Sequence, residues 1–242
     1  MRGAPPACIV DEVEALKREA GIAACSFVRS GMKLGLGTGS TVRYTVLEIG
    51  RRMAEEGLDV TGVPTSEATR ELSDSLGIPL LTLNEAGELD LTIDGADEFD
   101  PNFDLIKGGG GALTREKRVA EASRAMVVVA DDRKQVGVLG AFDLPMEVVA
   151  SDWEDVRDHM TGICPGEVRL RGGRAPYLTD DGGYILDCEF GPTISDPESL
   201  QSQIRSVAGV VDVGLFVSIC DAVVMSSSSS VRTLLKDNGR LS

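Results

Sequence analysis

Histidine is nearly absent from the sequence, because His159 is the only one among 242 residues. Its neighbours place it on a predicted surface helix, where a lone histidine is most often an exposed residue without a special role. A Ser–His–Asp triad and a metal site of several histidines both need histidine inside a site. The composition therefore argues against these two kinds of catalytic centre.

Cysteines and long apolar runs are also scarce. The five cysteines, at positions 8, 25, 164, 188 and 220, form no Cys-x-x-Cys pair, which indicates free thiols in a reducing compartment rather than a disulfide or zinc framework. No apolar run reaches the roughly 18 residues of a membrane span, and residues 1–10 lack the basic and long apolar regions of a signal peptide. We therefore expect a cytoplasmic protein with no membrane partner.

Cationic side chains are outnumbered, with 24 Lys and Arg against 39 Asp and Glu and a net charge of −15. Nucleic-acid binding depends on cations that neutralise phosphates, so no nucleic-acid partner is expected. Seven of these cations nevertheless lie between 107 and 134, where only four acidic residues occur. An acidic protein that binds an anionic small molecule must concentrate its cations locally, so this segment is a candidate anion site.

The first half of the chain alternates between strand and helix patterns. An apolar fraction of 42% is typical of a globular protein, and the length exceeds one average domain. Such alternation predicts a parallel sheet covered on both faces. Strands are expected at 32–36, 60–63, 89–93 and 125–130, and helices from Asp11 to 27, from 41 to about 56, at 65–76 and at 114–124.

The pattern changes near Leu144. Strands at 146–150, 167–171, 184–190 and 210–216, with helices at 152–160 and 196–209, give the β-α-β-β-α-β order of a split-βαβ unit. A strand at 222–225 would return to the first sheet, and the serines at 226–230 would form a solvated loop. We predict an α/β fold: a Rossmann-like open parallel-sheet domain (residues 1–143 and 217–242) with a smaller inserted ferredoxin-like α+β domain (residues 144–216).

The first motif, Gly37-Thr38-Gly39-Ser40-Thr41, joins a strand to a helix. Glycines allow close backbone approach to an anion, and the helix N-terminus and hydroxyls supply donors. A dinucleotide fingerprint would need glycine where Ser40 stands and an acid after the next strand, and neither is present. Anion binding and simple helix capping by Ser40 both remain open.

The second motif, Asp94-Gly95-Ala96-Asp97-Glu98, follows a predicted strand. Ligands of open α/β sheets collect at the carboxyl ends of strands. A turn capped by Asp94 is the alternative, but three carboxylates in five residues repel one another, which favours a functional role. With Asp100 they could also form an oxygen cage for Mg²⁺ or Mn²⁺.

The third motif runs from Lys107 through four glycines to Glu116 and Lys117. Four consecutive glycines cost backbone entropy, and a lysine before a glycine loop that opens a helix suits an anionic oxygen. Glu116 could instead merely complement the helix dipole. Together the three motifs suit proton abstraction beside a carbonyl better than hydrolysis or hydride transfer.

These motifs occur in the order of a known family. With Val129–Lys134, Leu144–Val148, Ile194–Pro197 and Gly209–Phe216, the chain resembles the A-type ribose-5-phosphate isomerases from about Leu16 to Met225. It departs from the pattern at Val217–Cys220 and in the serine tract.

The resemblance implies an enzyme of the non-oxidative pentose phosphate pathway that interconverts D-ribose 5-phosphate and D-ribulose 5-phosphate through an enediolate. It implies Glu116 as the base, Lys107 as the cation that stabilises the enediolate, and Asp94 and Asp97 for ring opening and proton movement between oxygens. The resemblance implies that no metal or organic cofactor is needed. It also implies that the protein forms a homodimer or a homotetramer. The implied substrate-binding residues are Lys17, Thr38, Gly39, Ser40, Thr41, Asp94, Gly95, Ala96, Asp97, Lys107, Gly108, Gly109, Gly110 and Lys134.

Other functions fit these motifs less well. A non-catalytic sugar-phosphate sensor could dispense with Glu116 or Lys107, yet both are present. A nicotinamide-dependent dehydrogenase needs the missing fingerprint residues. Sugar-phosphate deaminases and CoA transferases share the layered fold but differ from the Lys107–Lys117 segment.

Overall fold

The computed structural model describes the backbone of residues 7–241 and the side chains of residues 12–241. Its larger sheet has six strands in the order β13-β12-β6-β3-β1-β2. The first five in the chain are parallel, and β13 is antiparallel to β12 at the edge. The strands are β1 (Lys33–Leu36), β2 (Thr61–Pro64), β3 (Leu91–Gly95), β6 (Met126–Asp131), β12 (Ala222–Ser227) and β13 (Ser230–Leu235).

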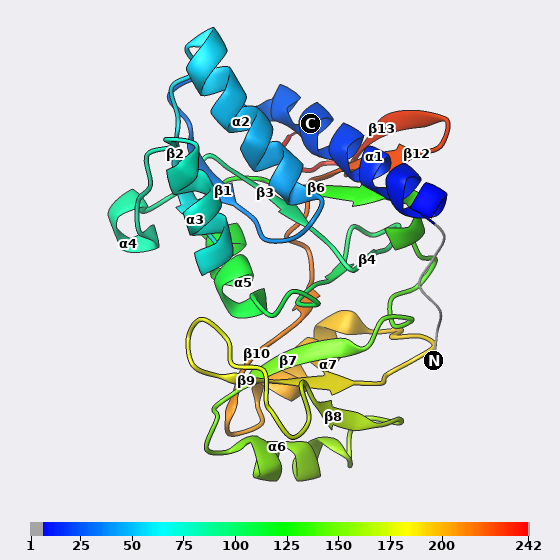
Figure 1. Cartoon of the computed structure of the whole chain (residues 1–242). Helices are drawn as coiled ribbons and strands as arrows, with labels where there is room; N and C mark the ends of the chain where they lie inside the picture. The colour runs from blue at the N-terminus through cyan, green and yellow to red at the C-terminus, as the bar shows by residue number, and fades with distance from the viewer. Residues whose placement is uncertain (1–6, 242) are drawn as a thin grey trace.

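Helices cover both faces of this sheet, as the alternating pattern predicts (Figure 1). Along β6, Val127 and Val129 pack in one apolar cluster, whereas Met126 and Val128 pack in another, because successive side chains of a strand point to opposite faces. The helices α1 (Ala7–Ala24) and α2 (Val42–Glu56) pack in the first cluster, and α5 (Leu113–Glu121) packs in the second. The helix α3 (Glu67–Ser75) contacts α2 and the edge strand β2. The first helix begins at Ala7, rather than at Asp11 as was predicted from the sequence.

A second, four-stranded antiparallel sheet, called the small sheet here, has the order β10-β7-β9-β8. The chain therefore follows the predicted β-α-β-β-α-β order, with the fourth strand beside the first. Asp196 caps the second helix by accepting a bond from Ser199 N at 3.0 Å, as predicted. The elements are β7 (Leu144–Val148), α6 (Trp153–Met160), β8 (Val168–Leu170), β9 (Tyr184–Cys188), α7 (Pro197–Arg205) and β10 (Val210–Val213). The domain boundaries near residues 144 and 216 stay predictions.

The predicted strand 210–216 is wrong, because it breaks at Gly214. At Gly214 the chain stops pairing with β7 and turns to a new partner. Gly214 N makes a last bond to Pro145 O of β7 at 2.7 Å, and Gly214 O accepts from Lys107 N at 2.9 Å. The residues beyond it form β11 (Leu215–Phe216) in a three-stranded sheet with β5 (Leu105–Ile106) and β4 (Glu98–Phe99). Neither β4 nor β5 was expected from the sequence.

The predicted serine loop is also wrong, because Ser226 and Ser227 end β12 and Ser230 begins β13. The Ser226 side chain is buried, and its hydroxyl donates to Leu16 O on α1 at 2.6 Å. Serine's low strand propensity hid this hairpin. The short helix α4 (Leu83–Ala86), capped by Thr82 and Glu85, was also not anticipated.

Three expectations from the composition are answered for the described residues. His159 is exposed on α6, and Cys25, Cys164, Cys188 and Cys220 are free and buried; the Cys8 side chain lies outside the described part. No described helix is both long and apolar enough to cross a membrane.

Candidate active site

The three motifs meet in one cleft of about 350 Å³ at the carboxyl ends of β1, β3 and β6. This volume lies in the range of small-molecule sites. Asp94 and Gly109 of the predicted set lie just outside the lining. The cleft is lined by Lys17, Thr38, Gly39, Ser40, Thr41, Gly95, Ala96, Asp97, Lys107, Gly108, Gly110, Glu116, Asp131, Arg133 and Lys134.

The helix α2 opens onto this cleft without a side-chain cap. Thr41 occupies the N-cap position and its side chain makes no capping bond, so the alternative of helix capping by Ser40 does not hold. The first N–H groups of a helix carry partial positive charge and bind anions when no side chain satisfies them. Ser40 and Thr41 therefore surround a helix end suited to an anion.

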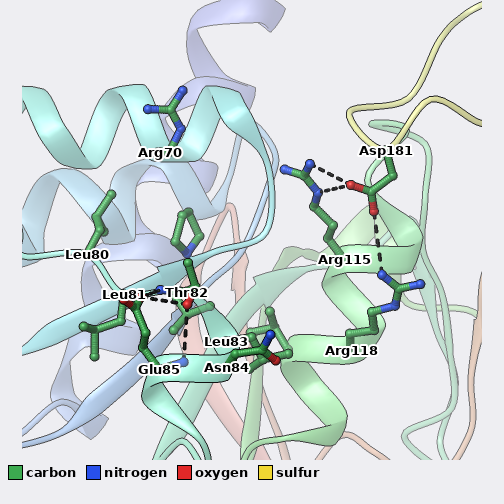
Figure 2. Close-up of a pocket in the computed structure, with 13 residues that line it drawn as sticks. Arg70, Leu80, Leu81, Thr82, Leu83, Asn84, Glu85, Arg115, Arg118 and Asp181 are labelled. Carbon is green, nitrogen blue, oxygen red and sulfur yellow. Dashed lines mark hydrogen bonds and ion pairs between the residues drawn. The ribbon is translucent and has the colours of Figure 1, made fainter.

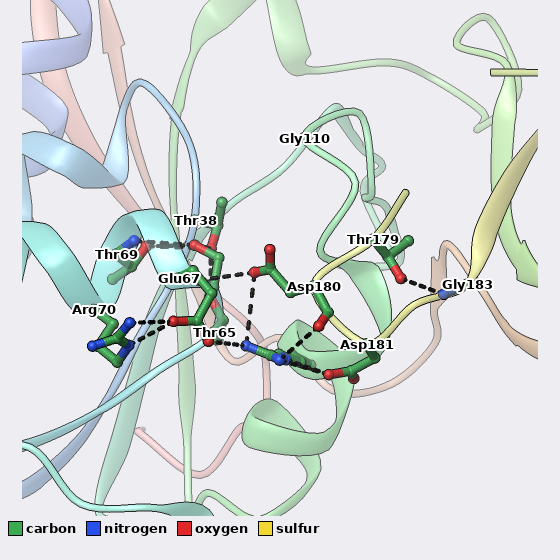
Figure 3. Close-up of polar contacts among 12 residues, drawn as sticks. Thr38, Thr65, Glu67, Thr69, Arg70, Gly110, Thr179, Asp180, Asp181 and Gly183 are labelled. Carbon is green, nitrogen blue, oxygen red and sulfur yellow. Dashed lines mark hydrogen bonds and ion pairs between the residues drawn. The ribbon is translucent and has the colours of Figure 1, made fainter. Parts of the chain in front are cut away.

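The Thr38 hydroxyl, which was expected to donate to a bound anion, lies among other hydroxyl groups of the protein. It lies 2.7 Å from Thr65 Oγ1 and 2.8 Å from Ser66 Oγ, and Thr69 Oγ1 lies 3.3 Å away (Figure 3). Thr69 Oγ1 in turn donates to Gly37 O at 2.9 Å. This hydroxyl cluster at the start of α3 holds the loop after β1, and the first motif alone gave no signal for it.

Asp94, at the end of β3, is fully buried beneath the cleft. Its Oδ1 accepts bonds from Thr38 N at 3.0 Å and Gly95 N at 2.7 Å, and its Oδ2 lies 3.0 Å from Lys107 Nζ. A side chain at Gly37 would overlap Asp94, since its Cβ would lie 2.2 Å from Oδ1. Asp94 therefore links the first and third motifs rather than facing the cleft.

Lys107 and Glu116 are almost completely buried in the cleft wall, with exposures of 2% and 4%. Lys107 Nζ donates to Gly95 O at 2.5 Å and lies 3.4 Å from Glu116 Oε2. The ring of Phe216 packs against the same ammonium at 5.4 Å. Glu116 Oε2 accepts no hydrogen bond from any described residue, although a buried oxygen normally has a donor. It is therefore available to a bound molecule.

Burial shifts the two carboxyl groups of this cluster toward their neutral forms. Burial, followed by the negative charge of Asp94, raises the pKa of Glu116 to about 8, against the opposing pull of Lys107. Burial also raises the pKa of Asp94 despite Lys107. Burial acts to lower the pKa of Lys107, but attraction to Asp94 and Glu116 outweighs it and raises that pKa. The Lys107 ammonium thus lies between the carboxyl groups of Asp94 and Glu116, and the negative charge of one carboxyl group makes ionisation of the other less favourable.

Asp97 and residues 108–111, called the glycine loop here, form the adjoining wall. Asp97 is partly exposed, lines the cleft and accepts from Gly109 N at 2.7 Å. Gly108 has φ +106° and Gly111 has φ +81°, conformations that residues with a Cβ rarely adopt. The run of glycines is therefore required by backbone shape as well as by space.

Among the described residues, three cations besides Lys107 line the cleft: Lys17, Arg133 and Lys134. Lys17 comes from α1 and lies 2.6 Å from Glu14. Arg133 lies 2.7 Å from Asp131, and neither residue was assigned a role from the sequence. Lys134 packs its ammonium 6.0 Å from the Phe142 ring.

The four acidic residues considered as a cation cage do not converge. Glu98 accepts from Gly140 N at 2.8 Å and Phe142 N at 2.5 Å, and Asp100 accepts from Asn102 N at 2.9 Å and Asp104 N at 3.0 Å. Across the described residues, no group of three or more His, Cys, Asp or Glu side chains is arranged to hold a metal ion.

A second cavity of about 530 Å³ lies on the other side of α5, lined by leucines from 80 to 83 and by Arg70, Arg115 and Arg118 (Figure 2). None of the predicted site residues lines it. Its arginines are paired with acids: Arg115 lies 2.6 Å from Asp181 and 3.0 Å from Glu67. These pairs tie the turn before β9 to α3 and α5 (Figure 3).

Comparisons with known proteins show which family the sequence matches. A model of the family described as ribose 5-phosphate isomerase A (phosphoriboisomerase A) matches residues 61–230. The chain is 49% identical over 234 residues to ribose-5-phosphate isomerase A of Cereibacter sphaeroides, covering 94% of this chain and 93% of that one. It is 42% identical over 218 residues to the Bacillus mycoides protein of that name, covering 90% and 98%.

Solved structures show the same likeness. Ribose 5-phosphate isomerase A from Methanocaldococcus jannaschii has a TM-score of 0.86 at 38% identity, covering 92% of this chain and 99% of that one. A D-ribose-5-phosphate isomerase in complex with phospho-erythronic acid has a TM-score of 0.88 at 34% identity, covering 92% and 99%. Because both sequence and fold agree over nearly the whole length, the chain belongs to the ribose 5-phosphate isomerase A family.

Proposed function

We propose that this chain interconverts D-ribose 5-phosphate and D-ribulose 5-phosphate through an enediolate. The observation that carries the proposal is the buried ion pair of Lys107 and Glu116, whose Oε2 lies 3.4 Å from the ammonium and accepts no hydrogen bond from the described residues, in a cleft that ends at the uncapped N-terminus of α2. One end of the cleft suits carbon acid chemistry and the other suits a phosphate.

Glu116 is the base. Its carboxylate takes the proton from C2 of the open-chain aldose and returns it to C1, while a hydroxyl proton passes from O2 to O1. The raised pKa of Glu116, about 8, makes it a stronger base than an exposed carboxylate, and a base works best when its pKa lies near the working pH.

Lys107 stabilises the negative charge that develops on the sugar oxygens, together with N–H groups of the glycine loop. Asp94 holds the Lys107 ammonium from beneath the cleft, at 3.0 Å. Asp97, which lines the cleft, moves the hydroxyl proton and assists ring opening. The two aspartates thus have different tasks, a division that the sequence left open.

The phosphate binds at Ser40 and Thr41, at the N-terminus of α2, with Lys134 and Arg133 across the cleft. Lys17 approaches from α1, already paired with Glu14. These groups neutralise the phosphate locally in a protein of net charge −15. Phospho-erythronic acid should bind here as well, because its carboxylate would lie where enediolate charge develops.

Three further expectations accompany this function: no metal or organic cofactor takes part, the protein is cytoplasmic, and it assembles as a homodimer or homotetramer. Light scattering of the purified protein tests the assembly.

The direct test is to follow ribose 5-phosphate by NMR in D₂O with the purified protein. We expect ribulose 5-phosphate to form and solvent deuterium to enter C1 of the ketose and C2 of the aldose at equilibrium. Absence of interconversion would refute the function. Interconversion without any deuterium after many turnovers would refute the enediolate, because a direct hydride shift keeps the original hydrogen.

A further inference from the structure

The glycine loop is held from the small sheet by two side chains that the sequence did not single out. Arg171 Nη1 donates to Gly108 O at 2.9 Å and to Gly109 O at 3.2 Å. The Tyr177 hydroxyl donates to Gly110 O at 3.3 Å. Three consecutive carbonyl groups of the loop therefore receive donors from the same neighbouring segment.

The Arg171 guanidinium is itself fixed. Asp187 on β9 accepts from Arg171 Nε at 2.9 Å and from Nη2 at 2.5 Å. The Tyr177 ring centroid lies 5.9 Å from the same guanidinium. A two-pronged arginine–carboxylate pair has a defined direction as well as a charge, so the remaining guanidinium nitrogen points at the loop with little freedom.

The direction of these carbonyl groups determines the direction of the N–H groups that follow them, because a trans peptide unit is planar and its C=O and N–H point to opposite sides. With Gly108 O turned to Arg171, Gly109 N–H points the other way and donates to Asp97 at 2.7 Å. With Gly109 O turned to Arg171, Gly110 N–H points away from Arg171, and Gly110 itself lines the cleft.

Such an external hold matters because glycine has more backbone freedom than any other residue. Nothing in the loop's own side chains can fix its peptide planes. Electrostatic stabilisation of a transition state depends on donors that are oriented before the reaction begins.

We propose that Arg171 is a positioning residue for the isomerisation: held by Asp187, it turns the peptide planes of the glycine loop so that the Gly110 N–H faces the substrate. The proposal rests on the proposed function, since it assigns that N–H group to the enediolate. Arg171 does not itself line the cleft.

The kinetic test compares Arg171→Ala and Arg171→Lys with Arg169→Ala. Arg169, two residues earlier on β8, pairs with Asp143 and with Glu167 at 3.0 Å and is the matched control. Misplacing catalytic groups by about 1 Å can cost 100-fold, so we expect both Arg171 variants to lose roughly 10- to 100-fold in kcat, with KM changed less than about threefold. Arg169→Ala should keep wild-type values. Full kcat in Arg171→Lys, or a loss confined to KM, would overturn the proposal.

A milder variant guards against loss of the fold. Asp187→Asn preserves the size of the side chain but weakens its hold on the Arg171 guanidinium, so it should lower kcat when introduced into the wild type. It should lower kcat no further when introduced into Arg171→Ala, because both changes act through the Arg171–Asp187 pair. Additive losses in the double variant would contradict the assignment.

Amide hydrogen exchange separates this proposal from the proposed function. The N–H groups of Gly109 and Gly111 are hydrogen-bonded, to Asp97 and to Gly108 O, and both should exchange faster in Arg171→Ala but not in Arg169→Ala. Unchanged exchange would refute the hold on the loop. If the wild type fails to convert ribose 5-phosphate, the function is wrong, and the exchange data still decide whether Arg171 orders the loop.

Discussion

The ammonium nitrogen of Lys107 lies 3.4 Å from Glu116 Oε2, and both side chains are almost completely buried. A base and the cation that must stabilise its product thus share one desolvated contact, where electrostatic effects are stronger than in water. Asp94, on the other side of the ammonium at 3.0 Å, keeps Lys107 charged and disfavours ionisation of Glu116.

Glu116→Gln should abolish most of the activity. The change preserves size and removes the base, so turnover should fall at least ~10²–10⁴-fold, while KM should change little. Steady-state kinetics with ribose 5-phosphate measure both. A variant that kept more than about a tenth of the rate, well outside the range for a lost base, would show that Glu116 is not the base.

The same variant should be more stable than the wild type at alkaline pH. The folded-state pKa of Glu116 is raised from 4.5 to about 8, so the folded protein favours the protonated form and loses stability as pH rises through this interval. The neutral amide avoids that loss. Urea unfolding should show equal midpoints near pH 4.5 and a growing advantage for Glu116→Gln toward pH 8.

Glu98→Gln is the control for this comparison. Glu98 is equally buried, but its two oxygens accept backbone N–H groups of Gly140 and Phe142. An amide would place a donor against one of them, so this variant should be less stable than the wild type. An advantage for Glu116→Gln that did not depend on pH would contradict the electrostatic explanation.

The pH dependence of kcat/KM should have an acidic limb far above the usual carboxyl range. The base must be deprotonated to act, so activity should fall as pH drops through the pKa of Glu116, about 8, which reflects burial and Asp94. The apparent pKa of this acidic limb describes Asp94 and Glu116 as a pair, because the ionisation of each depends on the charge of the other. A limb centred near the second pKa of a phosphate, about 6, would instead report the substrate.

The two lysines should differ in which kinetic constant they control. Lys107→Ala should lower kcat about 10²–10³-fold, as for loss of an oxyanion donor. Lys134→Ala should mainly raise KM, because a phosphate is bound equally in the ground and transition states. If the two effects were exchanged, the proposed roles of the lysines would be reversed.

Activity should survive exhaustive dialysis against a chelator, and Mg²⁺ or Mn²⁺ should not rescue Lys107→Ala. The oxygens of Asp94, Glu98 and Asp100 already accept bonds from the protein, and Lys107 supplies the positive charge that an ion would bring. Activity that disappeared on chelation and returned with a divalent ion would refute the lysine mechanism.

Much of the fold was predictable because its signals are local. The buried run in β6 and the cap at Asp196 followed from apolar periodicity and capping chemistry. Gly214 ends a strand only because Lys107 and Pro145 bind its backbone, and no neighbouring residue encodes that partner change. Ser226 is in a strand because α1 supplies an acceptor at Leu16.

The site shows the same division. The motifs placed Lys107, Glu116 and Asp97 in one cleft, since each follows a strand or opens a helix at the same sheet edge. The residues that hold them were not foreseen: Thr69 and Arg171 act on backbone atoms far along the chain, and side chain–backbone contacts of this kind leave no spacing pattern in a sequence.

The contact between Gly214 and Pro145 has a consequence for building chimeras of this family. The chain that carries the small sheet departs and returns at that one hydrogen bond, and Gly214 also anchors the backbone of Lys107. Ends that meet in this way allow a segment to be exchanged as a unit. A transplanted segment that retains both junction residues keeps the lysine in place, but it preserves turnover only if it also brings an arginine to the carbonyl groups of Gly108 and Gly109.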